Sequence, residues 1–340
     1  MPNNSTKILF LMTLISGMLI SLSANSWLGA WMGLEINLLS LIPLLSSNQN
    51  MFSTEASIKY FLTQTLASSS LLFLILLKIN TNEYFHFDFN FSNNLIMIPL
   101  LLKIGCAPFH WWLPPVVEGS SWMNSLLILS VQKVAPFILI SYIIMNSIFI
   151  QLIIIISSLT GAIGGLNQTS IRKILSFSSI NHIAWMLLTM TLSLNLWFLY
   201  FAIYMINITI IIMMAYSTNI SFILQSFNSL NDKKIFTLFL LTSFMSLGGL
   251  PPFLGFFPKW ITINFMMQNL LTFTAMILIM SSLITLFYYL RIMYSSFMLI
   301  SSENFWLFNL HFKKFNFQLA INLMINMLGM LALTLILLVC

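Results

Sequence analysis

Long apolar runs that carry almost no charge follow one another along the whole chain. The sequence has 340 residues, of which 59% are hydrophobic and only 6% are charged. A helix of about 20 apolar residues spans the hydrocarbon core of a bilayer, so the runs predict an all-α polytopic membrane protein with about eleven transmembrane helices. The predicted spans are Ile8 to Ala24, Trp27 to Leu45, Ser57 to Ile79, Leu95 to Trp112, Trp122 to Asn146, Ile148 to Leu166, Ile174 to Ser193, Leu196 to Tyr216, Ile235 to Phe257, Leu271 to Ile300 and Gln318 to Val339.

The basic residues lie singly or in pairs near the ends of these spans. If successive loops alternate between the two sides of the membrane, one side receives Lys7, Lys59, Arg172, Lys173, Lys233, Lys234, Lys313 and Lys314, and the other receives Lys78. Positive residues concentrate on the side of synthesis, so the N-terminus is predicted to face that compartment and the C-terminus the opposite one. This topology accounts for the net charge of +6, and the scattered pattern does not indicate nucleic-acid binding.

Four ionisable residues, Glu35, Lys103, Lys133 and Lys259, lie inside or against apolar runs. One such side chain at the bilayer centre costs roughly 2.5 to 3.5 kcal/mol on insertion scales, and such residues by default mark ion or proton paths. Glu35, Lys103 and Lys133 are deep in their spans, whereas Lys259 is a terminal lysine if its span ends at Phe257.

Basic residues close to span ends have a simpler interpretation. Long side chains there extend to the headgroups and keep the charge in water. We assign this structural role to Lys7, Lys59, Lys78 and Arg291.

Glycine and proline interrupt two of the predicted spans. Gly105 and Pro108 follow Lys103 directly, and Pro251, Pro252 and Pro258 lie in a glycine-rich block that ends at Lys259. Irregular backbone inside a membrane persists only where it is buried in protein or lines a wet cavity. Pro136 is a third predicted break, because a proline leaves free the carbonyl four residues before it, here that of Gln132 beside Lys133.

The two interrupted spans occupy comparable places and share a pattern of Gly followed by Pro-Phe. The sequence thus predicts one membrane domain, 1–340, with a first five-helix repeat at 8–146, a second at 148–300 and a last helix at 318–339. Because five is odd, the second repeat enters the membrane from the opposite side. Inverted repeats with broken helices near the midplane are typical of secondary transporters.

Two histidines are candidate relays. His110 follows Lys103 by seven residues, with Pro108 between them. His182 stands alone in an apolar span and suits either a proton relay or an interhelical hydrogen bond.

Three sequence blocks resemble a known family. The run His110-Trp-Trp-Leu-Pro114, with Ser130-Val-Gln-Lys-Val-Ala-Pro136 after it, is similar to the H-x-W-L-P core of the antiporter-like membrane subunits of respiratory complex I. The blocks at 25–37 and 249–260 resemble the subunit 2 family within this group, in its animal and insect members. The resemblance covers the whole chain.

The resemblance implies roles for the buried charges. Glu35 and Lys103 would form the charge pair of the first half-channel. Lys133 would be the bridging lysine, and Lys259 would be the terminal lysine of the second half-channel. The related subunit 4 has a glutamate at that last position. The second half carries no buried acid where the first has Glu35, so His182 or Lys133 would have to serve there.

The chain itself contains no recognisable redox site. It has no glycine-rich nucleotide loop, no flavin fingerprint and no cysteine set for an iron-sulfur cluster. Cys106 and Cys340 support neither a disulfide framework nor a metal site. The resemblance therefore implies that FMN, iron-sulfur clusters and ubiquinone are bound by other subunits.

The function that the resemblance implies is proton translocation, coupled to electron transfer from NADH to ubiquinone elsewhere in the complex. The expected partners are the other membrane and peripheral subunits and the lipids of the inner mitochondrial membrane, cardiolipin included. In that membrane the N-terminus would face the matrix and the C-terminus the intermembrane space. Two alternatives stay open from the residues: a free-standing cation/proton antiporter, for which no intramembrane aspartate is present, and a purely structural membrane subunit.

Overall fold

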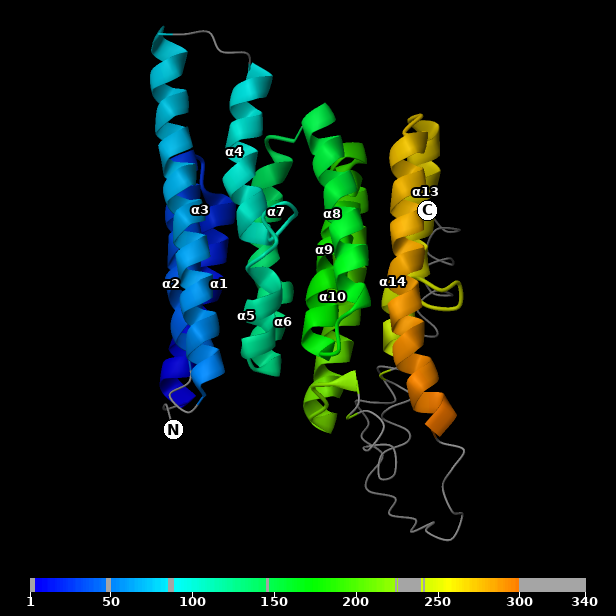
Figure 1. Ribbon diagram of the computed structural model, residues 1–340. Helices are drawn as coiled ribbons and strands as arrows, with labels where there is room; N and C mark the ends of the chain where they lie inside the picture. The colour runs from blue at the N-terminus through cyan, green and yellow to red at the C-terminus, as the bar shows by residue number, and fades with distance from the viewer. Residues whose placement is uncertain are drawn as a thin grey trace, which may run out of the picture. The chain divides into compact units, whose positions relative to one another are not determined.

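The protein is an assembly of α-helices in a computed structural model that describes residues 4–46, 50–84, 89–144, 147–223, 225, 240 and 242–299 (Figure 1). The helices are α1 (Asn4–Ser23), α2 (Trp27–Leu45), α3 (Met51–Tyr84), α4 (Phe89–Ile104), α5 (Leu113–Gly119), α6 (Trp122–Leu129), α7 (Val131–Ser141), α8 (Ile148–Leu166), α9 (Ile171–Leu192), α10 (Leu194–Thr218), α13 (Phe256–Gln268) and α14 (Thr272–Leu299). A further helical segment covers residues 242–248.

Eight segments of the described part are long and apolar enough to cross a membrane, one of which, Trp122–Ser141, comprises α6 and α7 together, and a shorter apolar helix covers Asn93–Ile104. The all-helical membrane class predicted from the sequence is confirmed. The predicted last span, 318–339, lies outside the described residues, as does the beginning of the span predicted at 235–257. The predicted span at 122–146 is divided, because α6 and α7 are separate helices.

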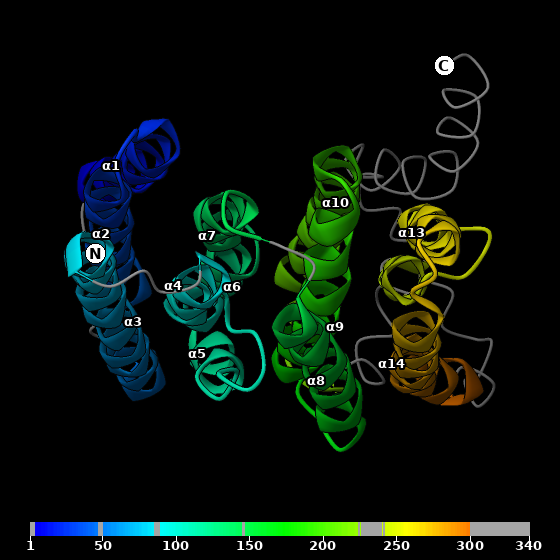
Figure 2. The same ribbon diagram turned by 90° about the horizontal axis from the view of Figure 1, so that it is seen from above.

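The chain divides into two compact units, Met1–Ser157 and Ser158–Cys340. The division falls inside α8, whereas the predicted repeats meet between residues 146 and 148. Within the first unit, α4 lies between α3 and α7, as the view of Figure 2 shows. This arrangement brings the break after α4 among the helices that carry the other polar residues of that unit.

Glycines let α1 and α2 approach each other closely. A Cβ added to Gly33 would lie 2.5 Å from the backbone nitrogen of Ser21, and one added to Gly17 would lie 2.9 Å from the nitrogen of Asn37. Small residues at helix crossings are the usual way in which membrane helices gain backbone contact. The crossing fixes the part of α2 that carries Glu35.

In the second unit, α9 is the most enclosed helix. Every residue from Ser178 to Met190 is buried, and α10, α13 and α14 all contact α9. A membrane helix buried on all sides contacts protein rather than lipid, so its polar residues need partners within the bundle. His182 lies in this stretch.

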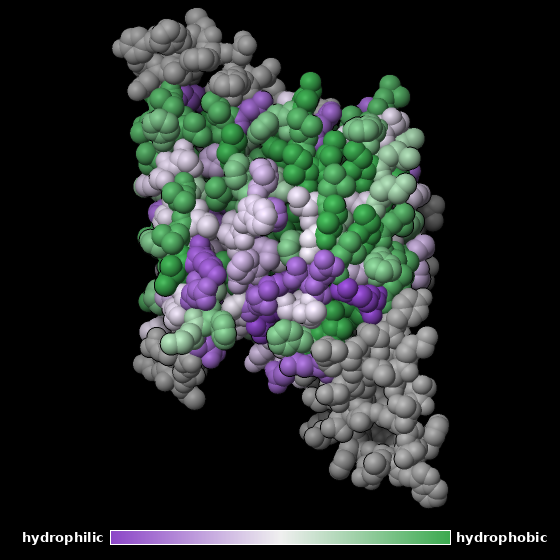
Figure 3. All heavy atoms as spheres, in the orientation of Figure 1, coloured by the Kyte–Doolittle hydropathy of each residue, from purple (hydrophilic) through white to green (hydrophobic). Residues whose placement is uncertain are grey.

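On the face drawn in Figure 3, green areas of apolar side chains run along the helices, with paler and purple areas between them. Exposed examples in unit 1 are Met12, Leu66 and Phe73, and unit 2 exposes Met276 and Phe287. Exposed apolar side chains on membrane helices are suited to lipid or to other apolar subunits.

Three of the basic residues assigned to helix ends have protein partners. Lys59 pairs with Glu55 at 2.5 Å on the exposed face of α3, and Lys78 donates to Asn93 at 2.9 Å. Arg291 donates to the carbonyls of Leu166 at 2.6 Å and Gln168 at 3.0 Å. The headgroup role for Arg291 was wrong, because its guanidinium caps the end of α8, where carbonyls lack helical partners.

Candidate functional site

The first predicted break is present. α4 ends at Ile104, and the chain turns through Gly105 and Pro108 before α5 begins. Gly105 has a φ of +80°, a left-handed conformation that glycine adopts without strain. The N–H groups of Gly105 and Cys106 both donate to the Leu101 carbonyl at 3.1 Å, which closes the last helical turn.

The second break repeats this local geometry. The helical segment 242–248 ends at Gly249, whose φ is +81°. The N–H groups of Gly249 and Leu250 donate to the Met245 carbonyl at 3.0 and 3.4 Å. The same glycine conformation and the same pair of hydrogen bonds therefore end both half-helices.

The prolines have different positions relative to the breaks. Pro251 and Pro252 lie in the turn that follows the segment 242–248, and Pro258 lies in the first turn of α13, where its missing N–H costs no helical bond. Pro136 was wrongly predicted as a break, because it lies inside α7. The interruption is at Ser130, with φ −120° and ψ −78°, between α6 and α7.

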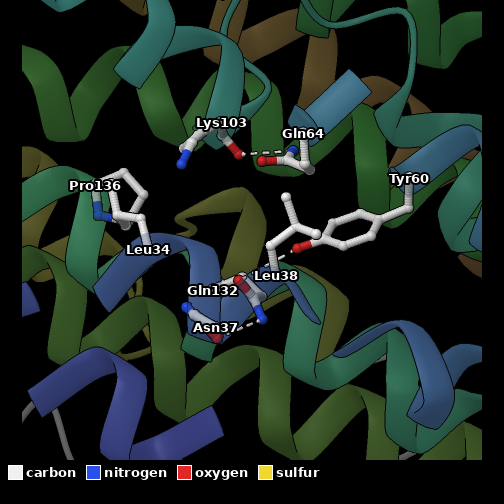
Figure 4. A pocket seen from close by; sticks show the side chains of 8 residues that line it. All are labelled: Leu34, Asn37, Leu38, Tyr60, Gln64, Lys103, Gln132 and Pro136. Atoms are coloured by element: carbon white, nitrogen blue, oxygen red, sulfur yellow. Dashed lines mark hydrogen bonds between the residues drawn. The ribbon is translucent and has the colours of Figure 1, made fainter. Parts of the chain in front are cut away.

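Lys103 borders a small cavity at the end of α4. Its side chain is 7% exposed, and the cavity of about 10 Å³ has the size that one water molecule needs. The lining residues are Leu34, Asn37, Leu38, Tyr60, Gln64, Lys103, Gln132 and Pro136. Figure 4 shows the Lys103 side chain on one side of this space and the Asn37–Gln132 pair on the other. A water-sized polar cavity beside a buried ammonium can relay a proton.

Glu35 lies within electrostatic range of Lys103 and of Tyr60. No ion pair within 4.0 Å joins Glu35 to Lys103 in the described part of the chain. One carboxylate oxygen of Glu35, Oε2, is buried and has no hydrogen-bond partner among the described residues. The two charges predicted to pair are therefore near each other but separated in this structure.

A chain of neutral polar groups connects three helices beside the cavity. Gln132 Nε2 of α7 donates to Asn37 Oδ1 of α2 at 3.0 Å, and Tyr60 of α3 donates to Gln132 Oε1 at 3.5 Å. Gln64 Nε2 lies 3.5 Å from the Lys103 carbonyl. These residues were not among the predicted site residues. Like the buried charges, each is a single polar side chain in an apolar span. A neutral polar residue in such a span is a weaker indication of a functional site than a charged one.

Replacing Gln132 with leucine is expected to weaken the bundle. Asn37 and Tyr60 are each 2% exposed and would lose a hydrogen-bond partner, and a buried polar group left unpaired costs about 1 to 3 kcal/mol. The midpoint of thermal unfolding in detergent should fall. Gln268→Leu, at the exposed end of α13, is the matched control and should leave the midpoint unchanged. Equal midpoints for both variants would show that the Gln132 bonds carry no stability.

Lys133 is the most enclosed of the predicted charges, with 1% of its surface exposed. It lies just after the interruption at Ser130, whose carbonyl accepts from the Lys133 N–H at 3.1 Å. It is also within electrostatic range of Cys106 in the first break. The ammonium is thus placed beside irregular backbone rather than in the middle of a regular helix.

Lys259 is 6% exposed and is not a terminal lysine extending into water. It lies in the first turn of α13, and its ammonium donates to the carbonyls of Gly248 at 2.9 Å and Leu247 at 3.4 Å. These carbonyls belong to the end of the half-helix 242–248. The structure therefore decides between the two interpretations of Lys259 in favour of a buried cation.

The two histidines differ in their surroundings. His110 follows the first break and stacks on Trp111 at a centroid distance of 4.9 Å, and its buried Nδ1 has no hydrogen-bond partner among the described residues. His182 Nδ1 lies 2.9 Å from the Tyr200 hydroxyl, and the Tyr204 ring is 5.2 Å away. His182 thus has a hydroxyl partner that can accept or donate a hydrogen bond.

Buried tyrosines in the second unit were missed by the sequence analysis. Tyr200, Tyr204, Tyr288 and Tyr289 are each at most 2% exposed. Tyrosine is common at the membrane interface, so its presence in an apolar span does not by itself indicate a polar cluster. Only the packing of α10 and α14 against α9 reveals one.

The sequence of this chain is similar to those of known membrane proteins. The model of the NADH:quinone oxidoreductase/Mrp antiporter transmembrane family matches residues 24–285. The chain is 42% identical over 331 residues to NADH-ubiquinone oxidoreductase chain 2 of Locusta migratoria, with 97% of each chain covered. It is 46% identical over 342 residues to the protein of the same name from Aedes aegypti, with 100% of each covered.

Solved structures share the fold. A chain of respiratory complex I from Thermus thermophilus has a TM-score of 0.76 at 22% identity, with 86% of this chain and 70% of that chain covered. A chain of the Mrp complex from Dietzia has a TM-score of 0.70 at 19% identity, with 83% and 59% covered. The helical arrangement of this chain is thus also found in a chain of each of these two complexes.

Proposed function

Because this chain belongs to the NADH-ubiquinone oxidoreductase chain 2 family, we propose that it is a proton-translocating subunit in the membrane arm of respiratory complex I. The observation that supports this proposal most directly is the placement of its buried lysines. Lys103, Lys133 and Lys259 each lie beside an interruption of a helix, and Lys103 also borders a cavity of water size. Irregular backbone at membrane depth is kept where it is buried in protein or lines a wet cavity, and the cavity beside Lys103 favours the second case at the first break.

The proposed action begins at Glu35 and Lys103. A conformational change driven from the quinone-reducing end of the complex would bring the separated charges together or move them apart. An opposite charge favours the protonated lysine and burial disfavours it, so the change would load or release a proton. Lys133 would receive it next, and Lys259 would be the terminal lysine of the second half-channel.

The finer architecture is part of the same proposal. We infer eleven transmembrane helices in two inverted five-helix repeats with a last helix at 318–339. The shared geometry at Gly105 and Gly249 supports the repeats, since equal glycine conformations and equal hydrogen bonds end both half-helices. Each repeat would provide one half-channel.

The proposal extends to location and partners. The subunit would lie in the inner mitochondrial membrane, with its N-terminus in the matrix and its C-terminus in the intermembrane space. Its partners would be the other subunits of the complex and bilayer lipids, cardiolipin included. FMN, iron-sulfur clusters and ubiquinone would be bound by other subunits, and this chain would perform no redox chemistry.

Lys103→Met tests the proposal in membranes that contain the assembled complex. The substitution keeps an unbranched side chain, one heavy atom shorter, and removes the exchangeable proton, so NADH-driven proton pumping should fall several-fold while the complex still assembles. Lys59→Met is the control, because Lys59 is exposed and pairs only within α3. Unchanged pumping in a fully assembled Lys103→Met complex would assign Lys103 to structure and remove the central residue of the mechanism.

A further inference from the structure

The second unit has few acidic residues to balance its buried lysine. The sequence after residue 157 contains only Asp232 and Glu303, and neither belongs to the described residues. Buried ionic groups need an opposite charge or several hydrogen bonds. The described partners of the Lys259 ammonium are the carbonyls of Leu247 and Gly248.

These two carbonyls are a suitable counter-charge. They belong to the last turn of the half-helix 242–248, and the last four carbonyls of a helix have no intrahelical partners. The C-terminal end of a helix carries the equivalent of up to about half a negative elementary charge. An ammonium held within 2.9 Å of Gly248 O and 3.4 Å of Leu247 O both satisfies the carbonyls and meets this charge.

The glycine that ends the half-helix provides the space for the lysine. A Cβ added to Gly249 would lie 3.0 Å from Lys259 Cδ and 3.1 Å from Lys259 Nζ. The φ of +81° would also strain any other residue. Gly249 therefore serves two purposes, to turn the chain and to leave room for the ammonium.

At the first break, Trp112 takes the capping position that Lys259 takes at the second. A Cβ added to Gly105 would lie 3.3 Å from Trp112 Cζ2, and the Trp112 indole N–H donates to the Leu102 carbonyl at 3.0 Å. A neutral donor thus caps the first half-helix and an ammonium caps the second. Lys103, which is not used as a cap, has Glu35 nearby instead.

We infer that the carbonyl end of the half-helix 242–248, shaped by Gly249, is the counter-charge of Lys259 and takes the place that Glu35 takes beside Lys103. The inference rests on the proposed function, in which Lys259 carries a proton. It assigns a positioning role to Gly249 and to the backbone of the break. The second half-channel then needs no carboxylate at this lysine.

Two substitutions of Lys259 in the assembled complex test the inference. Lys259→Gln keeps an N–H donor for the carbonyls and loses the charge, so pumping should be lost while the thermal midpoint stays near that of the wild type. Lys259→Met loses both, so pumping should be lost and the midpoint should fall by a few degrees. Equal midpoints for the two variants, with pumping lost in both, would overturn the inference and leave the proposed function intact. Pumping retained in Lys259→Met would remove Lys259 from the proton path and overturn the inference with it.

Gly249→Ala provides an independent measurement. If Gly249 acts through Lys259, the alanine variant should lower the ratio of protons pumped to electrons transferred, because its Cβ would take space beside the Lys259 ammonium. Gly29→Ala is the control, because its Cβ would meet only side-chain atoms of Ala24 and Ser26, at 3.2 and 3.3 Å. A normal proton-to-electron ratio in assembled Gly249→Ala would overturn the role of this glycine. If Gly249→Ala does not assemble, the comparison of Lys259→Gln with Lys259→Met decides.

Discussion

Replacing Lys133 with methionine is expected to reduce NADH-driven proton pumping to below about a tenth of the wild-type rate, a barrier increase of more than about 1.4 kcal/mol. The effect should exceed that of Lys103→Met. Lys103 borders a cavity whose glutamine, asparagine and tyrosine side chains can still hold a water. Lys133 is 1% exposed and is packed against protein on all sides. The methionine side chain itself cannot take up a proton.

The measurement is proton pumping and quinone reduction in the same membranes, after native electrophoresis has shown an assembled complex. Lys7→Met is the control, because Lys7 lies on the exposed face of α1 and should leave both rates unchanged. Normal pumping in assembled Lys133→Met would exclude Lys133 from the path. Loss of assembly would instead show that its cation is needed for packing, and Lys133→Arg would then be compared, since it keeps the charge.

The sequence allowed the membrane class and the positions of two breaks to be predicted for physical reasons. Apolar runs of sufficient length have few alternatives to crossing a bilayer. Gly105 with Pro108, and the glycine-rich block with Pro251 and Pro252, stand out because proline after glycine disfavours a regular helix. Gly105 and Gly249 both have positive φ in the structure, so a local rule was enough at these two positions.

The third interruption could not be predicted in the same way. Pro136 was the visible signal, but the helix is interrupted at Ser130, six residues earlier, and continues through the proline. A proline inside a membrane helix is tolerated when neighbouring groups satisfy the freed carbonyl. Where the strain is relieved depends on the packing around α6 and α7, which the local sequence does not encode.

Capping partners distant in sequence were also beyond prediction. Arg291 caps α8 from α14, more than a hundred residues away in the chain, and Lys259 caps the half-helix 242–248. A basic side chain near the end of a span can extend into water, or it can donate hydrogen bonds to the free carbonyls at the end of another helix. Which one it adopts depends on whether a helix terminates within its reach.

This dependence explains why the role of Lys259 was open from the sequence. Its position near the end of a span suggested a terminal lysine, while the adjacent prolines suggested a buried one. The second break folds so that α13 begins beside the end of the previous half-helix, which encloses the side chain. The buried environment of Lys259 therefore depends on the geometry of the break.

Gly255→Ala is expected to prevent assembly of the subunit, because Gly255 lies directly against the backbone of the half-helix 242–248. A Cβ at this position would lie 1.7 Å from the Ser246 carbonyl oxygen and 2.7 Å from its carbon. Both are backbone atoms of the half-helix 242–248. The same serine is also held through its side chain, because the Ser246 hydroxyl donates to Asn207 Oδ1 at 3.2 Å. Overpacking against side chains costs about 1 to 3 kcal/mol, and a rigid backbone contact should reach at least the upper end of this range.

The consequence for Lys259 follows from the same contact. If Ser246 moves to admit a methyl group, the carbonyls of Leu247 and Gly248 move with it, and the ammonium loses its acceptors. The amount of assembled complex at growth temperature, measured by native electrophoresis and by NADH oxidation in the gel, should therefore fall to a small fraction of that in Gly29→Ala membranes. Normal assembly and pumping in Gly255→Ala would mean that the two half-helices are further apart than this structure shows, and the capped position of Lys259 would have to be abandoned with the contact.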